Sequence, residues 1–199
     1  GEFPVQRELL DWLAVDFIES GWDVKQLLRT IVSSEAYQRS SIIATPAVYE
    51  RDPQNRLLAR GPRFRMPSWM LRDQALAAAG LLHPEIGGAP VKSYQPAGVW
   101  AEATFGKKKY QVAKGQALYR RSLYTFWRRI VGPTMFFDTA KRQICEVKPF
   151  RTNTPMHALS TLNDITYVEA ARAMAESLLQ DANDDSTRFR IAGKRLLGR

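Results

Sequence analysis

The stretch that decides the fold class is residues 154–180, TPMHALSTLNDITYVEAARAMAESLLQ. It contains two helix starts in succession. Thr154 followed by Pro155 places a capping side chain before a proline at the first helical position, and Asp164 is a second capping residue. The apolar residues that follow each cap recur at helical spacing: Met156, Leu159 and Leu162, then Ile165, Val168, Ala171, Ala175 and Leu178. The stretch therefore predicts two consecutive helices, over 155–162 and 165–180.

Caps and apolar periodicity predict further helices on both sides of this stretch. Gly21 is a predicted stop for the first helix, Asp23 is a cap for the second, and Ser68 is a cap for the third. The predicted helices cover residues 6–20, 24–36 and 68–82, and a last one that begins near 185 or 186. Residues 116–131, QALYRRSLYTFWRRIV, fit a helical seam and also a strand; we favour a helix, because a strand of this length would be unusual.

Two long segments lack a periodic pattern. Residues 40–67 are interrupted by four prolines, and we expect loops there around one short helical turn near residues 53–59. Residues 83–115 are rich in glycine and proline, and an irregular segment of this length is often functional or interface-forming. We therefore expect a mainly α protein with little or no β-sheet, formed by a single irregular helical domain over 1–199 that is a fragment of a longer multidomain protein.

Composition excludes several classes of protein. With 45% hydrophobic and 25% charged residues, the chain is globular rather than disordered. A single cysteine excludes an intrachain disulfide and a multi-cysteine metal site. The histidines, His83 and His157, have no metal-site spacing, so we expect no metal and no cofactor in this chain. No apolar run is long enough for a membrane span, and we expect no signal peptide in this fragment.

The net charge of +9 comes largely from three segments: residues 107–109, 119–129 and 188–199. The middle one, YRRSLYTFWRR, interleaves four arginines with four aromatic residues and includes Arg120 and Arg121. Arginine offers a planar fork for phosphate or sulfate, and aromatic rings stack on bases or sugars. The alternative is a core helix on which the arginine stems cover the apolar face. The sequence leaves both readings open.

Other candidate site residues lie after this segment. Asp138 and Arg142 could pair within a helix, and Cys145 is either a reactive thiol beside cations or a buried structural cysteine. Arg151 and Asn153 precede a helix start, where they could bind an anion or satisfy free backbone donors. The complete candidate anion or ligand site consists of Arg120, Arg121, Asp138, Arg142, Arg151, Asn153, Asn163 and Asp164. Asp164 is also explained as a helix cap.

Seven stretches resemble the C-terminal planctomycete family labelled domain of unknown function 1553. They follow in order along nearly the whole chain: PVQRELLDWLAVDFIESGW, DPQNRLLAR, GPRFRMPSWMLRDQALAAAGLL, GGAPVKSYQPAGVWAEA, LYRRSLYTFWRR, FDTAKRQIC and RTNTPMHALSTLNDITYVEAARAMAE. The resemblance implies an exported or periplasmic multidomain protein with a cytochrome-c-like domain upstream. It also implies an association with polysaccharide breakdown. It assigns no roles to the candidate residues.

Three functions follow as hypotheses. The first is a non-catalytic interaction or scaffold domain of an exported, cytochrome-c-linked protein, with the upstream domains as partners. The second is an enzyme acting on anionic, sulfated polysaccharide, in which Asp138, Arg142, Arg151 and Asn153 line a pocket. The third is nucleic-acid binding, suggested by the basic charge but disfavoured because no recognised module is present. Whether the chain catalyses a reaction is left open.

Overall fold

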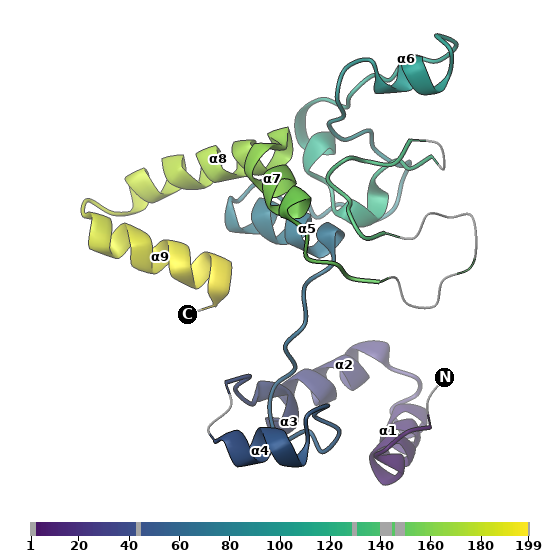
Figure 1. The fold of residues 1–199 in the computed structure, drawn as a ribbon, viewed down its shortest axis with the longest axis vertical. Coiled ribbons are helices and arrows are strands. Elements are labelled where there is room, and N and C mark those ends of the chain that lie inside the picture. Colours follow the sequence, from purple (N-terminus) through teal and green to yellow (C-terminus); the bar gives the residue numbers. More distant parts are fainter. Residues whose placement is uncertain (1–2, 43–44, 129–130, 140–144, 146–149, 199) are drawn as a thin grey trace. The chain divides into compact units, whose positions relative to one another are not determined.

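The computed structural model describes residues 3–42, 45–128, 131–139, 145 and 150–198. In this part of the chain the secondary structure is helical, with no strand and only two isolated β-bridges, so the predicted mainly α class is confirmed (Figure 1). The chain divides into two compact units, Gly1–Phe64 and Arg65–Arg199. The expectation of one domain over 1–199 stays a prediction, because two compact units can unfold either together or separately.

The two units differ in charge. The first contains 8 Lys and Arg against 9 Asp and Glu, whereas the second contains 21 against 11. The whole basic excess of the chain therefore belongs to the second unit. None of the helices in the described ranges has both the length and the apolar character needed to cross a membrane.

The first unit contains four helices, which local signals start and stop: α1 (Arg7–Glu19), α2 (Val24–Ser33), α3 (Glu35–Gln38) and α4 (Pro46–Arg51). Gly21 has a positive φ of 72° in the turn after α1, and the Asp23 carboxylate accepts hydrogen bonds from the first amides of α2. The predicted helix over 24–36 instead ends at Ser33, because Ser34 adopts an extended conformation and caps α3. α1 and α2 contact each other, but neither buries a residue.

The segment after α4 is a network of turns and not the helical turn predicted near 53–59. Asp52 is buried, and its carboxylate accepts hydrogen bonds from the amides of Arg56 at 2.9 Å and Leu57 at 2.7 Å. These bonds hold the pKa of Asp52 below its usual value, against the opposing effect of desolvation. The Arg60 guanidinium donates to the carbonyl oxygens of Asp52 and Pro53. Polar contacts therefore shape this turn, and the short helix forms earlier, at α4.

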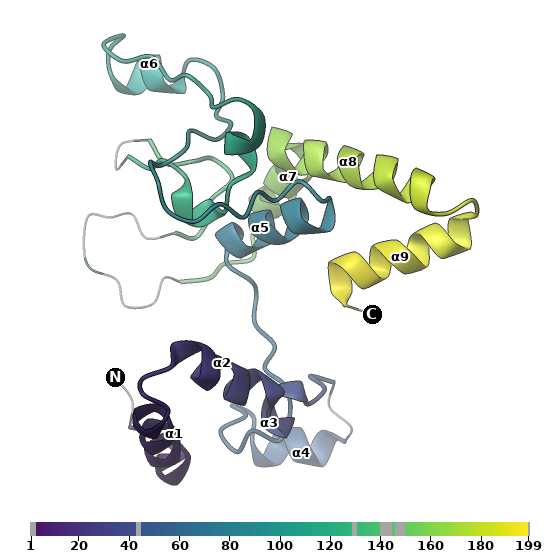
Figure 2. The same cartoon turned by 180° about the vertical axis from the view of Figure 1, so that it is seen from behind.

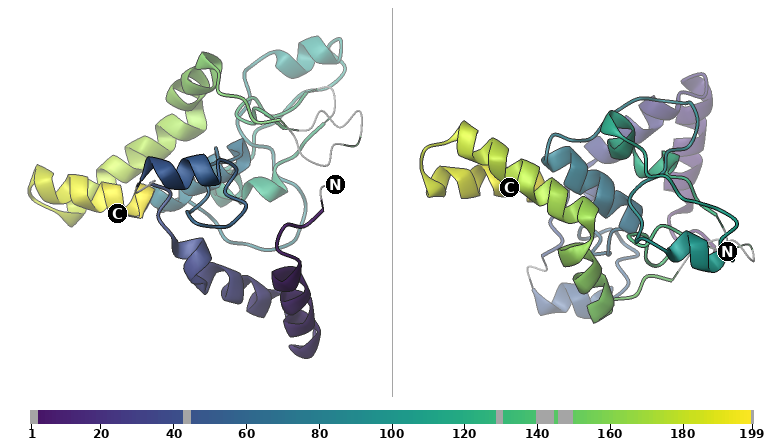
Figure 3. Two further views of the ribbon diagram at one scale, coloured as in Figure 1. Left: turned by 60° about the horizontal axis from the view of Figure 1, so that its bottom comes forward. Right: turned by 90° about the horizontal axis from the view of Figure 1, so that it is seen from above.

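The second unit is built around α5 (Ser68–Ala78) and α8 (Ile165–Asp181), which pack together (Figures 1 and 2). Their contact forms a core of buried apolar side chains: Leu76, Ala78, Ala79, Ala170 and Met174. α7 (Pro155–Asn163) precedes α8, and α9 (Asp185–Leu197) folds back along it, as Figure 3 shows from two further sides. The predicted helix starts at 155, 165 and 185 are confirmed.

Two predictions for this unit are wrong. Ser68 does not cap α5, because its hydroxyl donates to the Phe137 carbonyl oxygen at 2.8 Å. Over 116–131 the described residues form two short 3-10 helices, Gly115–Tyr119 and Ser122–Tyr124, followed by an extended segment, and not the predicted helix. The extended part pairs with the loop at Val91, whose amide donates to the Tyr124 carbonyl oxygen and whose carbonyl accepts from the Phe126 amide.

The loop-rich segment 83–115 contains one short helix, α6 (Val99–Ala103). This helix carries Trp100, which is buried and stacks on Tyr110 with ring centroids 5.1 Å apart. Trp100 also contacts the Phe126 ring at 5.9 Å. The long loop is therefore attached to the aromatic segment through a small aromatic cluster of its own.

Candidate functional site

Three of the predicted site residues, Asp138, Arg151 and Asn153, lie around Arg65, the first residue of the second unit. The carboxylate of Asp138 accepts hydrogen bonds from both the amide and the hydroxyl of Thr152, at 2.6 and 2.8 Å. The amide oxygen of Asn153 accepts from the Arg65 guanidinium, and Arg151 donates to the Arg65 carbonyl oxygen at 2.8 Å. Asp138 has a positive φ of 54°, so it is not part of the helix that the pairing with Arg142 required.

A buried histidine completes this group. His157 on α7 is 8% exposed, its ring stacks on Phe137 at 4.0 Å, and its Nε2 lies 3.7 Å from the Asp138 carboxylate. Burial opposes the ionisation of Asp138, but the bonds from Thr152 and the positive field of His157 and Arg65 outweigh it and lower the pKa. The cavity beside Asp138 is only about 10 Å³, enough for no more than one water molecule. The two hydrogen bonds therefore tie the chain at residue 138 to the chain at residue 152, and they leave little room for a ligand.

Arg120 is a structural residue in this fold. Its side chain is 4% exposed and its guanidinium donates to the carbonyl oxygens of Glu85, Gly87 and Ala89. It also stacks over the Tyr124 ring, 4.0 Å from the ring centroid. The arginine that follows it, Arg121, is exposed. The two adjacent arginines therefore have different environments. The sequence could not distinguish them, because both are arginines in the same segment.

The remaining candidates are dispersed. Asp164 accepts from the Thr166 amide at 2.9 Å and is the predicted cap of α8, while the Asn163 amide donates to the Leu159 carbonyl oxygen. Cys145 is exposed, which contradicts the buried alternative, and Arg142 lies outside the described residues. We find no group of three or more His, Cys, Asp or Glu side chains arranged for a metal ion within the described ranges.

Glu169 is also held by its own chain. Its Oε1 accepts a hydrogen bond from the Tyr119 hydroxyl at 2.8 Å, and the Tyr94 hydroxyl lies 3.5 Å away. The bond to Glu169, together with burial, raises the pKa of Tyr119 to about 12. Glu169 therefore ties α8 to the loop and the aromatic segment.

A groove of about 830 Å³ runs along α5 in the second unit. Trp69, Gln74 and Asp73 line it from α5, and Arg121, Thr125 and Trp127 line it from the aromatic segment. Asp73 is oriented by Ser122, whose amide and hydroxyl both donate to its Oδ1. The Thr125 hydroxyl is buried and has no hydrogen-bond partner among the described residues. This groove offers both stacking surfaces and polar groups.

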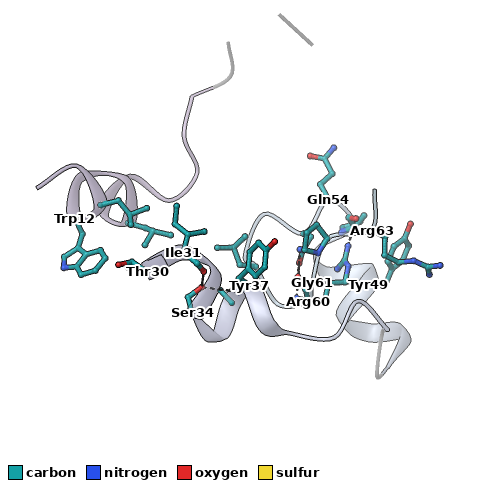
Figure 4. Close-up of a pocket in the computed structure, with 17 residues that line it drawn as sticks. Trp12, Thr30, Ile31, Ser34, Tyr37, Tyr49, Gln54, Arg60, Gly61 and Arg63 are labelled. Carbon is teal, nitrogen blue, oxygen red and sulfur yellow. Dashed lines mark hydrogen bonds between the residues drawn. The ribbon is translucent and has the colours of Figure 1, made fainter. Parts of the chain in front are cut away.

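A second groove, of about 750 Å³, lies entirely within the first unit (Figure 4). α1 and α2 contribute Leu9, Trp12 and Ile31 to it. Figure 4 shows Trp12 at one end of the lining and Arg63 at the other. The lining is mostly apolar, and much of it is open to solvent: Trp12, Tyr37 and Tyr49 are each at least half exposed.

The sequence did not identify several residues that form the group around Asp138 and the groove along α5. Arg65 and His157 were not assigned to a site because their partners, Asn153 and Asp138 respectively, lie far along the chain. Trp69 was not assigned because the groove that it lines joins α5 to the distant aromatic segment. The apolar periodicity predicted the helix that became α1, but it could not show that the apolar face of α1 stays exposed. Only the arrangement of the helices determines that.

These features define a mainly α-helical protein with an exposed apolar groove in one unit and a basic, groove-bearing second unit. The chain belongs to the PSD1 family, described as proteins of unknown function (DUF1553), whose model matches residues 1–199. Comparison with curated proteins and with solved structures gave no match.

Proposed function

We propose that this chain is a non-catalytic interaction module, which docks through its first unit onto the upstream domains of a longer protein. The observation that carries the proposal is the exposure of apolar side chains on α1 and α2: Leu9, Leu10, Trp12, Val15, Ile18, Val24, Leu28 and Val32 are each more than 40% exposed. In the described part of this unit no hydrophobic side chain is buried. A unit of this size gains too little from its own burial to remain stable alone, so a partner surface is the natural complement.

Three carboxylates of the second unit also favour this proposal. Asp138, Asp164 and Glu169 each bind groups of their own chain, and none of them lines either groove. Glycoside hydrolysis would require two carboxylates facing the same cleft. Export of the protein and its link to a cytochrome-c-like domain are parts of the proposal that rest on the family resemblance.

Hydrogen exchange tests the docking. In the longer parent protein we expect the backbone amides of α1 and α2 to exchange at least about tenfold more slowly than in the 199-residue chain, because docking suppresses local opening. Amides of α8, in the core of the second unit, serve as the internal reference. Trp12→Ser should abolish the slowing, whereas Leu57→Ser, at an equally exposed position outside the groove and outside α1 and α2, should preserve most of it. Equal exchange in both proteins would contradict the proposal.

A second candidate function is the binding of anionic polysaccharide by the second unit. The charge of this unit, +10 from 21 basic and 11 acidic residues, supports it, as does the groove along α5. Trp69 offers a ring for stacking, and Arg121 offers an exposed guanidinium for a sulfate or carboxylate.

Titration with dextran sulfate, uncharged dextran and DNA tests this candidate. We expect binding of dextran sulfate only, with Arg121→Gln weakening it about tenfold through the loss of one charge-assisted hydrogen bond. Arg172→Gln, which removes an exposed charge from α8, is the matched control. Equal effects of the two variants, or equal binding of DNA, would reduce the interaction to nonspecific attraction by net charge.

A further inference from the structure

The groove of the first unit has the composition of a protein-binding surface. Five of its 17 lining residues are Trp, Tyr or Arg: Trp12, Tyr37, Tyr49, Arg60 and Arg63. No Lys, Asp or Glu lines it, although the unit as a whole contains 9 acidic residues. The centres of protein interfaces are enriched in Trp, Tyr and Arg and depleted in Lys, Asp and Glu. The residue composition of the groove lining therefore favours a protein partner over a lipid surface.

The charge of the groove is positive and lies at one end. Arg60 already binds two carbonyl oxygens and lies over the Tyr49 ring, with 5.4 Å between its guanidinium carbon and the ring centroid. Arg63 is exposed and has no hydrogen-bond or ion-pair partner among the described residues. A partner that places a carboxylate there would gain a charge-assisted bond without disturbing Arg60.

The walls of the groove are suited to a helix. Leu9, Trp12 and Leu13 follow helical spacing on α1, and Thr30 and Ile31 continue the wall from α2. Side-chain ridges of this spacing accept the ridges of another helix. The described residues of the groove offer no strand edge that an extended peptide could join.

From these observations we infer that the groove binds an amphipathic helix of the partner, with apolar side chains at successive turns along Trp12 and Tyr37 and an acidic side chain against Arg63. This inference rests on the proposed docking function and specifies its occupant. Trp12 and Tyr37 are the expected anchors, because both are more than half exposed and have large apolar surfaces to bury.

Synthetic peptides test the occupant directly on the 199-residue chain. Three peptides of about 15 residues suffice: an amphipathic helix with glutamates at one end, the same helix with lysines there, and a scrambled version of the first without periodicity. Calorimetric titration is expected to show binding of the acidic helix, binding of the basic helix about tenfold weaker, and none of the scrambled peptide. Equal binding of all three would overturn the inference.

Variants of the chain localise the effect. Arg63→Glu should reverse the preference between the acidic and the basic helix, while Arg63→Lys should retain it. Arg51→Glu, an exposed position on α4 outside the groove, makes the same charge change and should leave the preference intact. A reversal by Arg51→Glu as well would mean that only net charge is sensed, and would overturn the inference.

Different results would refute the helical occupant and the docking onto the upstream domains. Slow exchange of α1 and α2 in the parent protein without peptide binding would retain docking and overturn the helical occupant. Peptide binding without slow exchange would retain the helical occupant and refute docking onto the upstream domains. A concentration-dependent dimer that Trp12→Ser dissolves would identify a second copy as the occupant, and would overturn the inference.

Discussion

Replacing Arg72 by methionine is expected to remove about 3–5 kcal/mol from the free energy of unfolding of the second unit. Arg72 is 1% exposed, and its guanidinium donates to the carbonyl oxygens of Leu118 and Arg120 at 2.8 and 2.9 Å and to the Ser122 hydroxyl at 3.2 Å. Methionine has a similar length but no donor, so these buried acceptors would lose their partner. Urea denaturation followed by circular dichroism measures the loss.

Arg172→Met is the matched control for Arg72→Met. The Arg172 side chain is 81% exposed and its ion pair with Glu176 lies on the surface of α8. Such a pair contributes at most about 1 kcal/mol, so the control should unfold close to the wild-type urea concentration. A similar small loss in both variants would mean that the carbonyl oxygens of Leu118 and Arg120 find other donors. It would thereby refute the central role given to Arg72.

Replacing Gly61 by alanine is expected to cost the first unit about 1–3 kcal/mol, enough to unfold a unit with so little buried apolar surface. A Cβ at this position would overlap the Arg39 carbonyl oxygen and lie 3.3 Å from the Ser41 amide nitrogen. Both neighbours are backbone atoms, which cannot rotate away. The bond from the Gly61 amide to the Ser40 carbonyl, at 3.0 Å, would then be lost. Hydrogen exchange of α2 amides measures the loss.

Gly21→Ala separates this clash from the general cost of replacing a glycine. Gly21 has a positive φ of 72°, but no atom lies within 4 Å of the position that a Cβ would occupy. Its replacement should cost about 1 kcal/mol from backbone strain alone. If Gly61→Ala costs no more than Gly21→Ala, the close approach of residues 39–41 and 60–62 does not stabilise the unit.

The helices that local signals specify were predictable from the sequence. Asp23 and Asp164 cap helices where the capping rules place them, and α7 begins at Pro155 as predicted, although the Thr154 side chain makes no capping bond. The apolar periodicity set the lengths of these helices to within a few residues. Capping bonds and helical spacing connect residues only a few positions apart, so they depend little on the rest of the fold. The mainly α class follows from them.

The aromatic segment was not predictable, because distant groups compete with its own helical hydrogen bonds. Arg72 takes the carbonyl oxygens of Leu118 and Arg120, and Val91 pairs with Tyr124 and Phe126 on the other side. A helical pattern of aromatic residues carries no information about these partners. Tertiary contacts therefore overrode the local preference for a helix.

The candidate site shows the same limit. The sequence put Asp138, Arg151 and Asn153 in one candidate site, and the structure joins Asp138 to Thr152, which lies between the other two along the chain. It could not separate buried Arg120 from exposed Arg121, or join Arg65 to Asn153, since those distinctions depend on contacts across tens of residues.

The sequence by itself determined the helices, their caps and the basic charge of this protein. Only the tertiary structure decided which faces and which charges stay available to a partner. The physical reason is that capping and periodicity are properties of one segment, whereas burial is a property of the segments around it. The exposed apolar face of α1 and α2, with Arg63 at one end of its groove, follows from that second kind of information alone.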